Sequence, residues 1–92
     1  MEIVGHIHQL YPTKDVNVNY QEREVVIKTE EQYPQYLLIS FFQDKCNLLN
    51  PYNVGDYVSV SINIKGKEWV SPQGETKYFN KLDGWKIFQL QK

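Results

Sequence analysis

The chain has 92 residues, of which 41% are hydrophobic and 23% are charged, and its formal net charge is −1. This length and composition predict one globular domain over residues 1–92 and exclude a low-complexity chain. The sequence has no signal-peptide pattern, no apolar run of about 20 residues that could span a bilayer, and a single cysteine, Cys46, so we expect a cytoplasmic protein.

The small net charge hides an uneven distribution. Residues 1–61 contain four Lys/Arg and eight Asp/Glu, whereas residues 62–92 contain six lysines and three acidic residues. The two segments therefore sum to −4 and +3. An anion-binding surface is expected in the last third of the chain.

The first half of the chain reads as three strands. Apolar residues of one parity (Ile3, Gly5 and Ile7) predict a strand over 2–10, and the polar segment 11–21 predicts a connection. β-branched residues predict a second strand over 23–29. Residues 36–42 are apolar on both parities, which predicts a strand that is covered on both sides or presents one face to a partner.

The second half reads as a short helix followed by two long strands. The helix is expected near residues 44–52, with Asp44 as a possible N-cap and Pro51 ending it. Strict alternation predicts a strand over 57–69, bent or bulged near Gly66, and a last strand over 77–91 with a bulge at Gly84. In the first of these strands, the residues predicted to face inward are Val58, Val60, Ile62 and Ile64, and those predicted to face outward are Ser59, Ser61, Asn63 and Lys65.

Five strands with one short helix between the third and the fourth predict an all-β OB-fold, which is a five-stranded Greek-key barrel. An SH3-like barrel or a small open sandwich is the alternative. The SH3-like barrel also has five strands but usually lacks a helix at that point.

The sequence carries no catalytic pattern. It has no GxGxxG, GxxxxGK[ST], HExxH or GxSxG motif, so we predict that it is not an enzyme and needs no cofactor. His6 and His8 form an HxH pair, but no cysteine or carboxylate cluster accompanies them, and we predict no metal site. Cys46 is expected to be packed rather than reactive.

A binding surface has more support, because the segment from Lys65 to Lys86 combines rings with lysines. Rings accept stacked bases and lysines follow phosphates, so this combination favours single-stranded nucleic acid. The groove is expected to be formed by the strands over 2–10, 57–69 and 77–91. Phe79 and Trp85 could belong either to the core or to the site. The predicted nucleic-acid-binding residues are Trp69, Tyr78, Phe42, Tyr36, Trp85, Lys65, Lys67, Lys77, Lys81 and Lys86.

The chain resembles an uncharacterised bacterial domain family of OB-fold type that is grouped with single-strand DNA-binding proteins. Four segments carry this resemblance: EIVGHIHQLYP, REVVIKTEEQYPQYLLISFF, VGDYVSVSINIKGKEW and KYFNKLDGWKI. The resemblance covers residues 2–88. Its most specific parts are the turn at Glu31–Pro34, Lys67-Glu68-Trp69 (where the family often has arginine first), and Tyr78-Phe79-Asn80 leading to Gly84-Trp85-Lys86.

The resemblance implies single-stranded DNA binding and association into dimers or tetramers. The positions most typical of the family are Lys67, Trp69, Tyr78 and Trp85. The acidic tail of typical bacterial single-strand-binding proteins is missing, so recruitment of repair enzymes is not expected. RNA is a second possible ligand. The rival hypothesis is a protein-interaction or assembly module with no nucleic-acid role, in which the same rings form one dry patch rimmed by charges.

Overall fold

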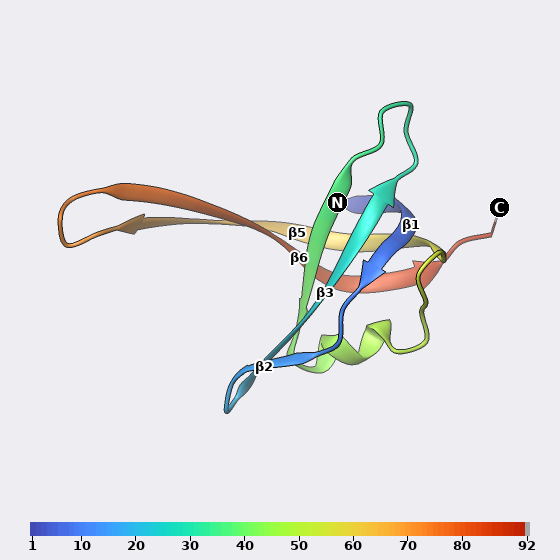
Figure 1. Cartoon of the computed structure of the whole chain (residues 1–92), viewed down its shortest axis with the longest axis horizontal. Helices are drawn as coiled ribbons and strands as arrows, with labels where there is room; N and C mark the ends of the chain where they lie inside the picture. The colour runs from blue at the N-terminus through green and yellow to red at the C-terminus, as the bar shows by residue number, and fades with distance from the viewer. Residues whose placement is uncertain (92) are drawn as a thin grey trace.

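The computed structural model describes residues 1–91. Five of its strands close into a ring (Figure 1). The ring strands are β1 (Glu2–Leu10), β3 (Tyr20–Thr29), β4 (Tyr36–Phe42), β5 (Tyr57–Val70) and β6 (Thr76–Gln89). Their order is β1-β5-β6-β4-β3, and β3 pairs back onto β1. All pairings are antiparallel except the one between β4 and β6. This closed five-stranded arrangement confirms the predicted OB-fold.

The interior of the ring is filled by the apolar residues of alternating parity that the sequence pattern predicts. Ile3, Ile7, Val58, Val60 and Ile62 are all buried in one cluster, which also includes residues of β3 and β4. Ile64 was expected to face inward as well, but it is 58% exposed. The reason is that β5 has already left the barrel at this point, so neither parity of the strand has a core to face.

A sixth strand, β2 (Lys14–Asn17), lies outside the ring and pairs with the start of β3. The prediction of a plain connection over 11–21 is therefore wrong, because this polar segment forms a short hairpin with β3. The side chain of Gln43 holds the hairpin by accepting a hydrogen bond from the Gln21 backbone N–H (2.9 Å) and donating one to the Asn19 carbonyl (2.9 Å). All four residues of β2 are exposed, so burial leaves no periodic signal in this segment.

The predicted helix is a 3-10 helix, η1 (Gln43–Leu49), that lies across one end of the barrel (Figure 1). Asp44 is not its N-cap, because Phe42 occupies that position with an extended backbone and no side-chain capping bond. The expected end is confirmed, since the helix stops at Leu49, before Pro51. Cys46 is packed as predicted: it donates to the Phe41 carbonyl (3.3 Å), and burial raises the pKa of its thiol.

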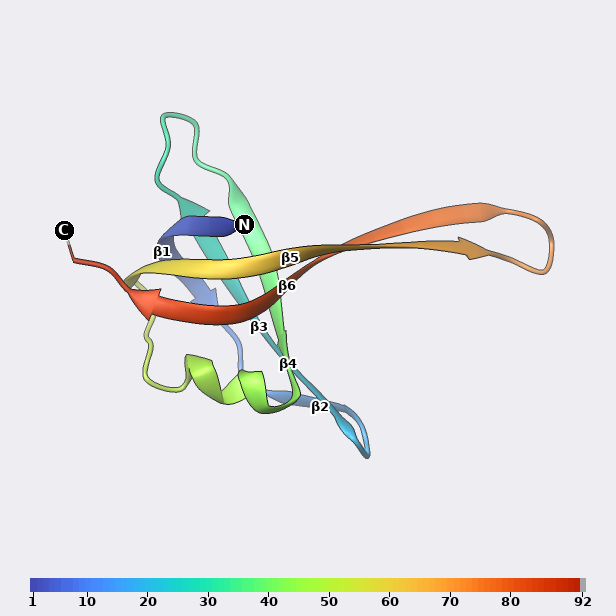
Figure 2. The ribbon, with the colours of Figure 1, turned by 180° about the vertical axis from the view of Figure 1, so that it is seen from behind.

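Strands β5 and β6 extend well beyond the barrel as a long two-stranded arm (Figures 1 and 2). The pairing in the arm is continuous from Ile62–Gly84 to Val70–Thr76, so the predicted irregularity at Gly66 is not a bulge. The predicted bulge at Gly84 is confirmed, with Trp85 as the extra residue. A Cβ atom on Gly84 would lie 2.6 Å from the Phe41 ring, which explains why glycine stands here. Within residues 1–91, no helix is long and apolar enough to cross a membrane.

Candidate nucleic-acid interface

One face of the β5–β6 arm carries rings and lysines in alternation. Residues directly opposite each other in an antiparallel pair share a face of the sheet. The pairs on this face are Lys65–Lys81, Lys67–Phe79 and Trp69–Lys77. All six side chains are exposed, and they are called the arm strip from here on. The arm strip therefore presents two rings among four lysines.

Phe79 is a member of the arm strip that the sequence left undecided between core and site. It is 54% exposed, because the arm has no second layer to cover it. Its parity relative to Lys77 and Lys81 was the available signal, since residues two apart on a strand share a face. Trp85, the other undecided ring, is 43% exposed at the bulge and does not belong to the arm strip.

The opposite face of the arm has a different character. Tyr78 lies there, paired with Glu68, so the structure separates Tyr78 from Trp69. Ile64 and Val70 share this face and are exposed. This face therefore carries apolar side chains and no lysine.

Two surface depressions continue the arm strip toward the barrel. One, of about 420 Å³, is lined by Lys65, Gly66, Lys67, Phe79, Asn80 and Lys81. The other, of about 550 Å³, is lined by Tyr20, Phe42, Gln43, Asp44, Lys45, Lys65, Lys81 and Asp83. Lys65 and Lys81 line both, so the two depressions are adjacent. No residue of β1 contributes to either depression, so the surface that continues the arm strip is formed by β3, β4, β5 and β6.

Phe42 lies at the barrel end of this surface and is already engaged by two neighbours. The Tyr20 ring stacks on it, with centroids 5.4 Å apart and planes inclined by 28°. The Lys81 ammonium lies 5.0 Å from the Phe42 centroid. Tyr20 is a ring of the site that sequence reasoning missed, because it stands in the segment predicted to be a connection.

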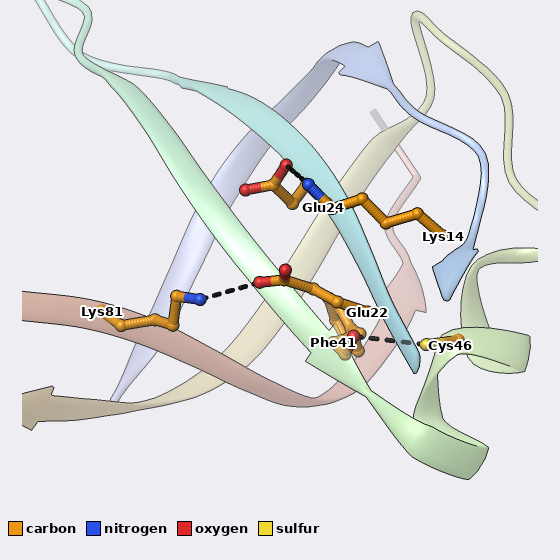
Figure 3. A network of polar contacts seen from close by, with 6 residues as sticks. All are labelled: Lys14, Glu22, Glu24, Phe41, Cys46 and Lys81. Carbon is orange, nitrogen blue, oxygen red and sulfur yellow. Dashed lines mark hydrogen bonds and ion pairs between the residues drawn. The ribbon is translucent and has the colours of Figure 1, made fainter. Parts of the chain in front are cut away.

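Lys81 of β6 is held in place by Glu22 of β3, across the intervening strand β4 (Figure 3). The Lys81 Nζ donates to a Glu22 carboxylate oxygen at 2.8 Å, and Glu22 is buried. Burial alone would raise the pKa of Glu22, but the hydrogen bonds from Lys81 and Ser40, together with the positive charges of Lys81 and Lys14, outweigh burial and hold the pKa below its ordinary value. The charge of Lys81 is therefore largely balanced within the protein.

The other lysines of the arm strip differ in how far their charge is compensated. Lys65 makes only a long ion pair with Asp83, at 3.9 Å. Among residues 1–91, neither Lys67 nor Lys77 forms an ion pair. These two side chains are the ones most available to a bound anion.

The remaining predicted site residues lie away from the arm strip. Tyr36 begins β4, six residues from Phe42, which corresponds to roughly 20 Å along an extended strand. Lys86 lies beyond the bulge, with its ammonium 5.6 Å from the centroid of the Phe88 ring. The structure thus brings together Trp69, Lys65, Lys67, Lys77, Lys81 and Phe42, and places Tyr78, Tyr36, Trp85 and Lys86 elsewhere.

The histidines of the HxH pair contact two different rings. His6 packs against Tyr57, and His8 packs against Tyr36. In the described part of the chain, no group of three or more His, Cys, Asp and Glu side chains is arranged to hold a metal ion.

Fold and surface together define a small OB-fold protein with an exposed arm of rings and lysines. The chain belongs to the family described as Domain of unknown function (DUF3127), whose model matches residues 2–88. This confirms the resemblance to an uncharacterised domain family of OB-fold type. No curated protein matches the chain in sequence.

Among solved structures, the chain is similar to Rim1, the mitochondrial single-stranded DNA-binding protein of S. cerevisiae. One crystal structure of Rim1 (form 2) superposes with a TM-score of 0.73 at 20% identity, covering 99% of this chain and 93% of Rim1. A selenomethionine-labelled crystal of the same form gives a TM-score of 0.67 at 20% identity, with the same coverage of both chains. At this identity the likeness establishes a shared fold.

Proposed function

We propose that this protein is a non-catalytic, cytoplasmic binder of single-stranded DNA, and that the arm strip is its principal contact surface. The observation that supports this most directly is the alternation of Trp69 and Phe79 with four lysines on one exposed face. A structural hairpin needs neither feature on a surface open to solvent. The similarity of the fold to a single-stranded DNA-binding protein points in the same direction.

In the proposed mechanism, the aromatic side chains contact bases and the lysine side chains contact phosphates. Trp69 and Phe79 stack on bases, and each stacked base contributes about 1–3 kcal/mol without strong sequence preference. Lys67 and Lys77 meet phosphates, because no carboxylate of the described chain neutralises them. Tyr20 and Phe42 extend the surface into the larger depression, where a further base can lie against the exposed side of the Tyr20 ring.

The experiment that tests this function is fluorescence anisotropy of a labelled oligo-dT of about 16 nucleotides, the upper end of site sizes for one OB-fold. Trp69→Ala is expected to weaken binding by about 5- to 150-fold, the factor that corresponds to one lost stacking contact. Tyr33→Ala is the control, because it removes an exposed ring from the turn between β3 and β4, outside both faces of the arm, and should bind as the wild type does. If the wild type does not bind at low salt, or if both variants are equally weakened, the proposed surface is wrong. An oligo-U of the same length, run in competition, measures the preference between DNA and RNA.

A second function, self-association, is supported by the opposite face of the arm. Ile64, Val70 and Tyr78 are exposed there beside a single charged residue, Glu68. Apolar and aromatic residues without lysine are typical of subunit contacts. We propose that this face contributes to a homo-oligomer, which sedimentation velocity tests: Tyr78→Ala should shift the distribution toward the monomer, and an unchanged distribution would contradict the proposal.

A further inference from the structure

A groove of about 300 Å³ lies on the barrel between the start of β1 and the turn that joins β3 to β4. Its apolar lining consists of Ile3, Val4 and Leu37, and its acidic lining consists of Glu2, Glu30 and Glu31. The Glu30 backbone N–H donates to the Val4 carbonyl at 3.4 Å, which keeps the turn beside β1. Carboxylates from two segments that are distant in the sequence therefore meet here, and the depression is called the acidic groove.

Two carboxylates of the acidic groove carry a charge that the fold leaves uncompensated. Glu2 accepts a hydrogen bond from the Ser59 hydroxyl at 3.3 Å, and Glu31 accepts one from the Thr29 hydroxyl at 2.9 Å. Both donors are neutral, and among residues 1–91 neither carboxylate forms an ion pair. Both glutamates are exposed. Such a surface repels phosphates and attracts a ligand that combines positive charge with an apolar part.

The arm strip has the complementary chemistry. Lys67 and Lys77 are its lysines without an ion pair, and they lie diagonally across the two strands, with Cα atoms roughly 8 Å apart. Trp69 stands directly opposite Lys77 and two positions from Lys67, so its exposed ring adjoins both lysines. The ring supplies an apolar surface for the apolar lining of the groove, and the two lysines supply the charges that the groove lacks.

The arm of the same copy cannot reach the acidic groove. The Ile62 backbone N–H donates to the Met1 carbonyl at 2.8 Å, so the start of β1 lies at the root of the arm. Trp69 is seven positions farther along β5, or about 23 Å from that root. The arm is continuously paired and points away from the barrel (Figures 1 and 2), so it does not fold back. The arm strip that fits the groove therefore belongs to another copy.

We propose that the acidic groove is the docking site for the arm strip of a second copy of this chain, and that docking competes with DNA for the same side chains. The two surfaces are different patches, so the contact is head-to-tail, unlike the self-association proposed for the opposite face of the arm. The docking contact stands independently of DNA binding, and only the competition rests on the proposed function.

The test is a charge swap followed by sedimentation velocity, with every protein carrying Tyr78→Ala to remove the apolar contact proposed for the opposite face. This parent should associate at about 10 mM salt, where charges act over about 30 Å, and dissociate at about 1 M, where they act over about 3 Å. The groove variant adds Glu2→Lys/Glu31→Lys, and the arm variant adds Lys67→Glu/Lys77→Glu. Each should be monomeric alone at low salt because like charges then meet. An equal mixture of the two should associate, since every groove again finds an arm of opposite charge.

Recovery in the mixture also shows that both variants are folded. If the parent stays monomeric at low salt, a second copy does not occupy the groove and the inference is wrong. It is equally wrong if either variant associates alone as the parent does, or if the mixture stays monomeric.

Competition is tested by adding a shorter oligo-dT, of about 6 nucleotides, to the associated parent. This length is near the low end of site sizes for one OB-fold, so one oligomer does not bridge two copies. The oligomer should return the parent to single copies, and the groove variant, whose arm strip is intact, should bind it at least as tightly as the parent. If the parent binds the oligomer and stays associated, the competition is wrong. If the charge swap succeeds but no protein binds oligo-dT, the docking contact stands and the proposed function fails.

Discussion

The salt dependence expected for the proposed DNA binding depends on which lysines of the arm strip are already paired within the protein. Lys81 is 2.8 Å from the buried Glu22, so its charge is compensated before any ligand arrives. Lys65, Lys67 and Lys77 remain, and each phosphate neutralised on a single strand contributes about −0.7 to the slope of log K against log salt. Three contacts predict a slope of about −2, and the double change Lys67→Ala/Lys77→Ala should reduce it to about −0.7.

Anisotropy titrations with the short oligomer at a series of salt concentrations measure this slope. Between 50 and 200 mM salt, the wild type should lose about 20-fold in affinity and the double variant about threefold. Lys81→Ala is the matched control, because the Lys81 ammonium is already paired with Glu22 and its removal should leave the slope unchanged. A Lys81→Ala slope that is smaller in magnitude than the wild-type slope by about 0.7, the contribution of one phosphate, would show that Lys81 contacts a phosphate despite its ion pair with Glu22.

Three further predictions concern the fold that supports the surface. Glu22→Gln should cost about 1 kcal/mol, or roughly 4–8 °C in thermal melting, because it removes the charge that pairs with Lys81. The fold lowers the pKa of Glu22, so this carboxylate stabilises the protein above its ordinary pKa of 4.5, and the difference between variant and wild type should disappear as acid protonates it. Gly84→Ala should cost about 1–3 kcal/mol in urea denaturation, since its Cβ would meet the Phe41 ring at 2.6 Å, and an unchanged midpoint would contradict this. Cys46 is buried and its thiol pKa is raised, so iodoacetamide at pH 8 should modify it slowly in the folded protein and quickly in denaturant; equal rates would show that the thiol is accessible.

The barrel could be predicted from the sequence because its strands alternate. The alternation of Val58, Val60 and Ile62 with polar residues predicts that their side chains are buried. Few known folds combine five such strands with a short helix after the third strand. Ile64 has the same parity and the same chemistry as Ile62, yet it is exposed. A local sequence pattern shows which residues share a face of a strand. It does not show where the strand leaves the barrel and has no core to pack against.

The sequence predicted the part of the candidate site that lies on one hairpin, but not the contacts between segments that are distant in the chain. Parity on one hairpin places Lys65, Lys67 and Trp69 together, and the continuous register of the arm bears this out. Tyr20 was missed because its neighbour Phe42 lies 22 positions away, and their contact depends on how β3 pairs with β4. The ion pair between Glu22 and Lys81 spans 59 positions and has no sequence signal at all.

The arm also has a consequence for solubility. Outside the barrel, β5 and β6 pair only with each other, so each leaves one edge of backbone N–H and C=O groups unpaired by any described strand. Open edges of this kind are templates for strand addition and aggregation, and lysines placed along them discourage it by repulsion and hydration. The four lysines of the arm strip stand on these two edge strands. Removing the lysine charges should therefore favour edge-to-edge pairing between the arms of different copies. Lysine variants of this protein should be checked for turbidity and soluble aggregates before weaker DNA binding is attributed to lost phosphate contacts.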